Sequence, residues 1–210
     1  MQGIIEKIQD RYSAESKGEC STLSCGSNLD YLNLQPGEWV LDLGCGAGRE
    51  TLEAAKRVGK QGVVVGLDIT SEMLKVAESN ARDSQLSNAR FITASIEQLP
   101  FADSSFNVVI SNCVINHALD KSKVYREIHR VLKAGGKFVV SDAVCKQPLP
   151  DEIKNDPEQW AACFGGAITE EEYLKSISDA GFYKVFILNR REYMKNGYEF
   201  ASLTIRADKN

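Results

Sequence analysis

Cysteine is the residue type in this sequence with the most distinctive chemistry. The six cysteines are Cys20, Cys25, Cys45, Cys113, Cys145 and Cys163. In a reducing compartment they stay thiols, so their number favours metal, metalloid or redox chemistry over a disulfide framework. Each one alone also fits the role of a small buried hydrophobic residue. Three of them, Cys25 before the first expected strand, Cys113 at the end of a middle strand and Cys163 in a late loop, are expected to meet at one rim of a sheet.

A glycine run marks a second site with chemical potential. Gly44, Gly46 and Gly48 follow the apolar segment 39–43 and precede a helical pattern over 50–58. Glycines there permit a sharp turn and close approach of the backbone to a ligand, while the start of a helix presents unsatisfied N–H groups. The spacing Gly-x-Gly-x-Gly differs from Gly-x-Gly-x-x-Gly, which argues against a nicotinamide or flavin dinucleotide.

Asp68 ends the next apolar segment, 63–67. In a parallel sheet its carboxylate would lie beside the glycine run and could accept hydrogen bonds from both hydroxyls of a ribose. The alternative is that Asp68 only caps the helix expected to begin near Ser71. The neighbouring glycine run favours the ribose interpretation.

Short apolar segments alternate with helical patterns along the chain. Predicted strands cover 39–43, 63–67, 90–94, 106–111 and 137–143, and predicted helices cover 4–12, 50–58, 71–85, 121–132 and 169–180. Residues 184–188 and 199–206 are expected to close the sheet as a hairpin-like edge pair. The pattern predicts an α/β fold with a mostly parallel seven-stranded sheet, helices on both faces and an antiparallel edge strand.

Length and composition limit the organisation and the partners. A chain of 210 residues, 43% of them hydrophobic, has the length of one domain. We expect the main domain to cover 36–210 and to include a cysteine-bearing loop over 146–168. An N-terminal arm over 1–35 is expected to contribute to the substrate site. The net charge of -4 argues against nucleic acid and anionic membranes as partners. No apolar run suggests a signal peptide or a membrane span, so a cytoplasmic protein is expected. We also expect the protein to be a monomer.

Several segments together resemble one enzyme family. They are Asp42-Leu43-Gly44-Cys45-Gly46-Ala47-Gly48, Leu99 to Phe106, Ser111-Asn112-Cys113-Val114-Ile115-Asn116, Trp160 to Ala167, and Tyr198 to Ser202. The chain resembles arsenite S-adenosylmethionine methyltransferases, within the class I methyltransferase superfamily. This resemblance covers nearly the whole chain, and it implies a Rossmann-like fold and S-adenosylmethionine as the cofactor.

The resemblance also implies functional residues. Cofactor contacts would come from Asp42, Gly44, Gly46, Gly48, Asp68, Ile69, Ile96, Glu97 and Asn112, with Ile96 and Glu97 near the adenine. The thiolates of Cys25, Cys113 and Cys163 would bind trivalent arsenic, a soft centre with three bonding positions and a lone pair. The implied substrates are arsenite and methylated trivalent arsenicals, in a detoxification reaction that uses glutathione or a thioredoxin-type reductant.

Two other functions fit parts of the same pattern. A methyltransferase for a small organic acceptor, quinone-like or sterol-like, would share the cofactor site but would not use the cysteines. A thiol-based metal or metalloid-binding protein is the second alternative, and zinc could take Cys25, Cys113, Cys163 and His117 as its ligands. No paired Cys-x-x-Cys motif supports such a structural zinc site.

Overall fold

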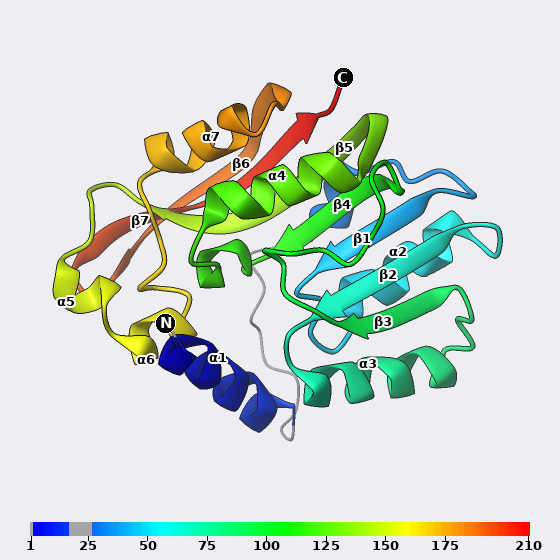
Figure 1. The fold of residues 1–210 in the computed structure, drawn as a ribbon, viewed down its shortest axis with the longest axis horizontal. Helices are drawn as coiled ribbons and strands as arrows, with labels where there is room; N and C mark the ends of the chain where they lie inside the picture. Colours follow the sequence, from blue (N-terminus) through cyan, green and yellow to red (C-terminus); the bar gives the residue numbers. More distant parts are fainter. Residues whose placement is uncertain (1, 17–26) are drawn as a thin grey trace.

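The structure is a computed structural model of the chain, and it describes residues 2–16 and 27–210 (Figure 1). Its elements, in chain order, are α1 Gln2–Glu15, η1 Asn28–Tyr31, β1 Trp39–Leu43, α2 Arg49–Val58, β2 Val63–Asp68, α3 Ser71–Asp83, β3 Ala89–Thr93, β4 Phe106–Asn112, η2 Ile115–His117, α4 Lys121–Val131, β5 Leu132–Cys145, α5 Asp151–Lys154, α6 Pro157–Ala161, α7 Glu170–Asp179, β6 Tyr183–Lys195 and β7 Tyr198–Asp208. Cys20 and Cys25 lie outside the described residues.

The strands form one seven-stranded sheet in the order β3-β2-β1-β4-β5-β7-β6. The first five in this order are parallel, and β7 runs antiparallel to both β5 and β6. The predicted fold class is therefore confirmed, with the antiparallel strand one place inside the edge. The reason is the hairpin between β6 and β7, whose turn residues Asn196 and Gly197 both have positive φ, as a tight two-residue turn requires.

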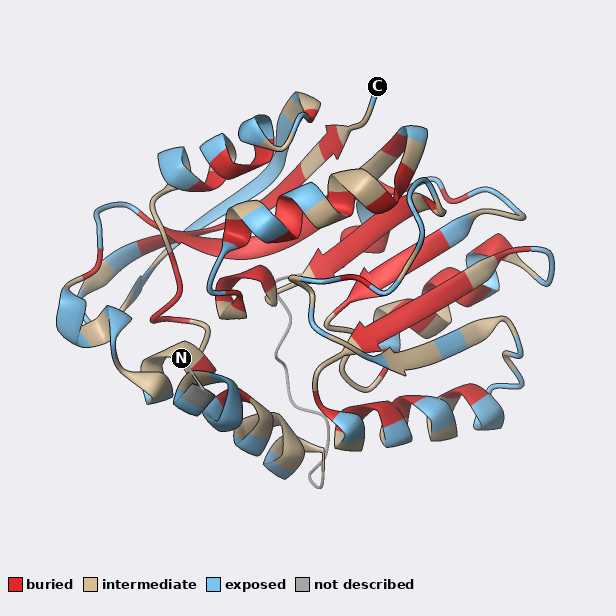
Figure 2. Cartoon of the chain, in the orientation of Figure 1, coloured by how far each residue is buried: buried red, intermediate tan, exposed pale blue. Residues whose placement is uncertain are grey.

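The central strands β1, β2 and β4 are buried on both faces, which explains their continuous apolar sequences, whereas the edge strands β3 and β6 are more exposed (Figure 2). On β4, Val108 and Ile110 pack in a cluster with residues of α2 and η1, whereas Val109 packs in a second cluster with residues of α4 and α7. The alternation follows from the two-residue period of a strand. The sheet is thereby held rigidly, and so are the residues at its carboxyl edge.

The helix α1 lies beside α6 (Figure 1). Lys7 Nζ pairs with Glu158 Oε1 at 2.7 Å, and the Arg11 guanidinium donates to the carbonyl oxygen of Ala161. These contacts place the first helix next to the loop that carries Cys163. Among the described residues, no helix is both long and apolar enough to cross a membrane.

Candidate functional site

A cavity of about 690 Å³ lies at the carboxyl ends of the parallel strands. The residues predicted for the site that line it are Asp42, Gly44, Gly46, Asp68, Ile69, Ile96, Glu97, Asn112, Cys113 and Cys163. Open parallel sheets bind ligands at this edge because the loops there are free to vary while the strands are fixed. One cavity thus holds both the predicted cofactor contacts and the two described cysteines of the predicted thiol site.

The glycine run turns the chain sharply at the end of β1. The amides of Gly44 and Cys45 both donate to the carbonyl oxygen of Leu67, at 2.7 and 2.9 Å, which joins the loop to β2. Gly44 has a φ of 66°, and a side chain there would collide with Val114. Gly48 does not line the cavity, and a Cβ at that position would lie 3.0 Å from the Cβ of Ala77 on α3, so its role as a cofactor contact stays a prediction.

Asp68 connects the glycine run to Thr70, the residue that precedes α3, through hydrogen bonds. Its Oδ2 accepts a hydrogen bond from the Gly46 amide and its Oδ1 accepts one from the Thr70 amide, each at 2.9 Å. The residue that precedes α3 as its N-cap is Thr70. Asp68 also lines the cavity, where its carboxylate can accept hydrogen bonds from a ligand. Burial raises the pKa of Asp68, and the two amide hydrogen bonds act in the opposite direction.

Two further carboxyl groups line the same end of the cavity. Asp42 is buried and accepts a hydrogen bond from Thr51 Oγ1 at 2.6 Å, and burial, with a smaller contribution from Glu50, raises its pKa to about 7. Glu50 accepts a hydrogen bond from the Asn28 amide at 2.7 Å, and burial raises its pKa as well. Such an acidic wall suits a ligand with cationic groups.

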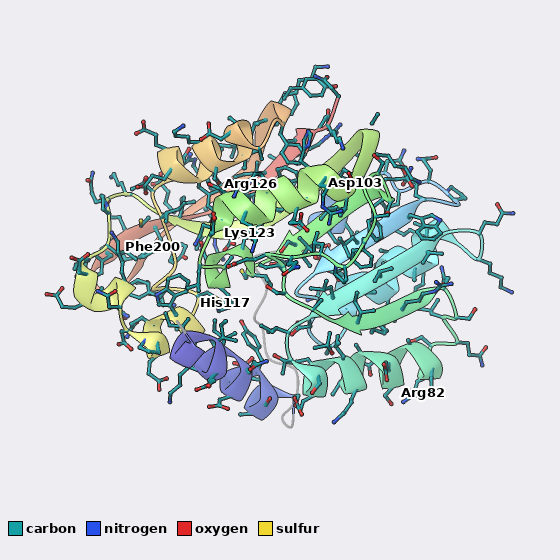
Figure 3. All side chains as sticks on the ribbon, viewed as in Figure 1. Arg82, Asp103, His117, Lys123, Arg126 and Phe200 are labelled. Carbon is teal, nitrogen blue, oxygen red and sulfur yellow. The ribbon has the colours of Figure 1, made fainter. Side chains whose placement is uncertain are left out.

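The thiol end of the cavity is built around Cys163. Its Sγ lies 2.9 Å from His117 Nε2, 3.4 Å from the carbonyl oxygen of Cys113 and 3.7 Å from the Tyr12 hydroxyl. The Tyr12 hydroxyl is also 3.1 Å from His117 Nε2. Figure 3 shows His117 below α4, near α1 and α6. Three distant segments therefore meet at one sulfur atom.

The groups of this cluster are neutral near pH 7. Burial is the main cause that raises the pKa of Cys163 to about 11, and Asp142 adds to the rise. Burial also lowers the pKa of His117 to about 4 and raises that of Tyr12. Cys163 is thus a thiol in this structure. Cys113 is disulfide-bonded, so it must be reduced before its sulfur can bind a metalloid.

Comparisons with known proteins agree on the family. The family model of a methyltransferase domain matches residues 34–181. Arsenite methyltransferases from Halobacterium salinarum and from Homo sapiens are each 39% identical to this chain, over 87% and 69% of it. The crystal structure of an arsenic(III) S-adenosylmethionine methyltransferase from Chlamydomonas reinhardtii superposes with a TM-score of 0.78 at 33% identity, covering 95% of this chain and 72% of that one.

The chain belongs to the arsenite S-adenosylmethionine methyltransferase family. This membership confirms three predictions made from the sequence: the family resemblance, the Rossmann-like fold class and S-adenosylmethionine as the cofactor. The chain spans about half the length of the curated relatives that it matches, 47% for the Halobacterium protein and 41% for the human one.

Within this family fold, the other two described cysteines have structural contacts. Cys145 is buried in an apolar cluster with Leu149 and Phe164, and its Sγ faces the carbonyl oxygen of Ala167 at 3.8 Å. Cys45 lines the cavity, but its Sγ also packs against β2, where a Cβ on Gly66 would lie only 2.8 Å away. Among the described residues, no group of three or more histidine, cysteine or acidic side chains could hold a metal ion.

Sequence reasoning missed two members of the thiol end of the cavity. Tyr12 stood in the helix predicted over 4–12, and nothing in that pattern distinguished it from a packing residue. His117 entered only as a ligand of the zinc alternative. Its position four residues after Cys113 was the available signal, because a short turn at a strand end can bring such neighbours to one rim.

Gly166, in the loop that carries Cys163, allows the backbone of this loop to pack closely against η2. A Cβ at this position would collide with the carbonyl oxygen of Asn116 and lie 2.9 Å from the Trp160 ring. We expect Gly166→Ala to lower the free energy of unfolding by about 1 to 3 kcal/mol, because neither backbone nor ring can yield easily. Urea denaturation measures this, with Gly3→Ala as the control, since nothing lies within 4 Å of a Cβ there. Equal midpoints for both variants would contradict the expectation.

Proposed function

We propose that this chain methylates trivalent arsenic that is bound by cysteine thiolates, with S-adenosylmethionine as the methyl donor. The observation that supports the proposal most directly is the single cavity lined at one end by Asp68 and the glycine run and at the other by Cys113 and Cys163. When bound, S-adenosylmethionine supplies an electrophilic methyl group on a sulfonium centre.

The residues of the acidic end fit that donor. Asp68 retains acceptor positions for ribose hydroxyls, as predicted, and Gly44 and Gly46 leave room for the backbone to approach the ligand. The carboxyl groups of Asp42 and Glu50 give this end of the cavity hydrogen-bond acceptors that suit the ammonium group of the donor, and a cation beside them favours their ionised form. Ile96 and Glu97 line the cavity where the adenine contact is predicted.

The sulfur end fits the acceptor. Thiolates prefer a soft centre such as trivalent arsenic, and sulfur ligands leave the arsenic lone pair unshared. Holding that lone pair beside the methyl group would replace a collision of two solutes by a reaction within one site. Cys113 and Cys163 supply two of the ligands in this proposal, and the third, Cys25, stays a prediction from the sequence.

A thiol reductant has two roles in the proposal. It reduces Cys113, which is disulfide-bonded here, and it returns arsenic to the trivalent state after each transfer. The second role follows because the arsenic lone pair becomes the arsenic–carbon bond, which oxidises arsenic by two electrons. Glutathione or a thioredoxin-type protein is the predicted reductant.

Product speciation tests the proposed function. The protein is incubated with methyl-labelled S-adenosylmethionine and glutathione, with arsenite or without any metalloid. We expect labelled methylarsenicals only when arsenite is present. Cofactor binding without any labelled arsenical would contradict the proposal and favour a small organic acceptor, whereas arsenite binding without cofactor binding would favour the thiol-based binding protein.

The third thiol gives a prediction about successive methylations. Each methyl group occupies one bonding position of arsenic, so a monomethylated arsenical needs only two protein thiolates while arsenite can use three. Cys25→Ser is therefore expected to slow the methylation of arsenite more than that of monomethylated trivalent arsenic. Initial rates on both substrates, with saturating S-adenosylmethionine and reductant, measure the difference. Equal losses on the two substrates would remove the special role of Cys25.

A further inference from the structure

The contact between His117 and Cys163 has no role in methyl transfer itself. That step uses the arsenic lone pair and needs no base. The step before it does move protons, because a thiol that bonds to arsenic loses its hydrogen while arsenic loses a hydroxide. A group that accepts a proton from Cys163 would therefore act during arsenic binding.

His117 is placed to be that group. Its Nε2 is 2.9 Å from Cys163 Sγ, within reach of the thiol hydrogen. Burial, together with Arg11 and Lys121, lowers the pKa of His117 and keeps the ring neutral, and only the Trp160 backbone acts in the opposite direction. The buried Nδ1 makes no hydrogen bond of ordinary geometry. A proton on Nδ1, toward the Trp160 backbone, leaves Nε2 as an acceptor facing the sulfur.

Burial and Asp142 disfavour a free thiolate at Cys163 and raise its pKa, whereas Tyr12, Arg11 and Lys195 act in the opposite direction. The thiol therefore needs an adjacent proton acceptor at the moment its sulfur bonds to arsenic. The Tyr12 hydroxyl, 3.1 Å from His117 Nε2, holds the ring in place from the α1 side. Both His117 and Cys163 line the cavity, so a ligand there can reach the pair.

We propose that His117 takes the proton of the Cys163 thiol as its sulfur bonds to arsenic and delivers it to the departing hydroxide. The sulfur–arsenic bond forms, the arsenic–oxygen bond breaks, and the proton and hydroxide leave together as water, with no change of oxidation state. This role of His117 rests on the proposed function, since it requires an arsenic substrate at Cys163.

The test compares His117→Ala with His129→Ala, the same change at the other histidine, which packs on Phe182 outside the cavity. Quenched flow and intact-protein mass spectrometry give the rate at which arsenite binds the reduced protein. We expect His117→Ala to bind on the order of 100-fold more slowly, the usual size of a proton-transfer contribution, with unchanged final stoichiometry. Added imidazole should restore much of the rate, and His129→Ala should match the unmodified protein.

Two results would overturn the role of His117. One is a binding rate of His117→Ala within twofold of the unmodified protein. The other is a slow rate that imidazole does not restore in a folded variant, which would mean that the ring only packs there. Should His117→Ala fail to fold, His117→Gln replaces it, because glutamine keeps a hydrogen-bonding group but is no base, and a rate equal to that of the unmodified protein would again overturn the role.

A second measurement separates this inference from the proposed function. The alkylation rate of Cys163 by iodoacetamide, followed by peptide mass spectrometry, reports loss of the thiol proton without any arsenic. If the unmodified protein binds no arsenite, the proposed function fails, yet slower alkylation in His117→Ala with recovery by imidazole would still support the proton transfer. Equal alkylation rates would overturn it.

Discussion

Cys163→Ser is expected to abolish methylation of both arsenite and monomethylated trivalent arsenic. A serine hydroxyl is a hard ligand that is ionised far less readily than a thiol, so it cannot replace sulfur on a soft centre. The sulfur of Cys163 lines the cavity shared with the predicted cofactor contacts, and no other described free thiol lies at that end. Cys113→Ser should have the same effect. Product speciation under saturating S-adenosylmethionine and reductant measures the loss.

Cys145→Ser is the matched control for that experiment. Cys145 is also at the end of the sheet, but it is buried among apolar side chains, and a serine there could still donate to the Ala167 carbonyl. We expect activity close to that of the unmodified chain, with some loss of stability. Full activity in Cys163→Ser or Cys113→Ser would overturn the arsenic site, and X-ray absorption that showed oxygen or nitrogen ligands on bound arsenic would do the same.

Asp68→Ala is expected to weaken S-adenosylmethionine binding by on the order of 10- to 100-fold. Removing the carboxylate leaves buried ribose hydroxyls without acceptors, a cost of about 1 to 3 kcal/mol. The change also frees the amides of Gly46 and Thr70, which loosens the glycine run before any ligand arrives. Calorimetric titration with the cofactor measures the affinity.

Two comparisons make the Asp68 result specific. Asp179→Ala removes a carboxylate that pairs with Lys175 on the exposed side of α7, and it should leave the affinity unchanged. A thermal melt of Asp68→Ala without cofactor separates loop loosening from ligand contact. Unchanged cofactor affinity in the folded variant would reject Asp68 as a ribose ligand.

The sequence predicted the central strands β1, β2 and β4 well because each is an apolar run that is bounded by turn residues and buried on both faces. The sequence did not predict the helices α5 and α6. They have four and five residues, which is too few turns for a helical pattern of apolar residues to be recognised. The sequence pattern also placed β5 at 137–143, whereas the strand runs from Leu132 to Cys145, since the Gly135-Gly136 pair was interpreted as a turn. The predicted hairpin was right, but β6 reaches Lys195 because the turn is at Asn196-Gly197.

The cofactor end of the site was predictable because its residues directly follow the strands β1 and β2. These strands are parallel neighbours, so the residues that follow them lie at the same edge of the sheet. The thiol end was only half predictable. The position of Cys163 depends on α6, on the Gly166 contact with η2 and on α1, three packing events without a local sequence pattern. Tyr12 and His117 reach the same sulfur through that packing, and only His117, four residues after Cys113, had a spacing that could have pointed to it.

Cys113 and Cys163 share a backbone conformation that L-residues avoid. Both have a φ of 58°, in the left-handed region where a non-glycine residue costs about 1 to 2 kcal/mol. At Cys113, glycine would relieve the strain but would also remove the disulfide bond, whereas at Cys163, a free thiol, it would relieve the strain with no covalent bond lost. Cys163 thus marks a position where backbone strain is kept for a thiol, and a variant library screened only for heat resistance is expected to lose that thiol before Cys113.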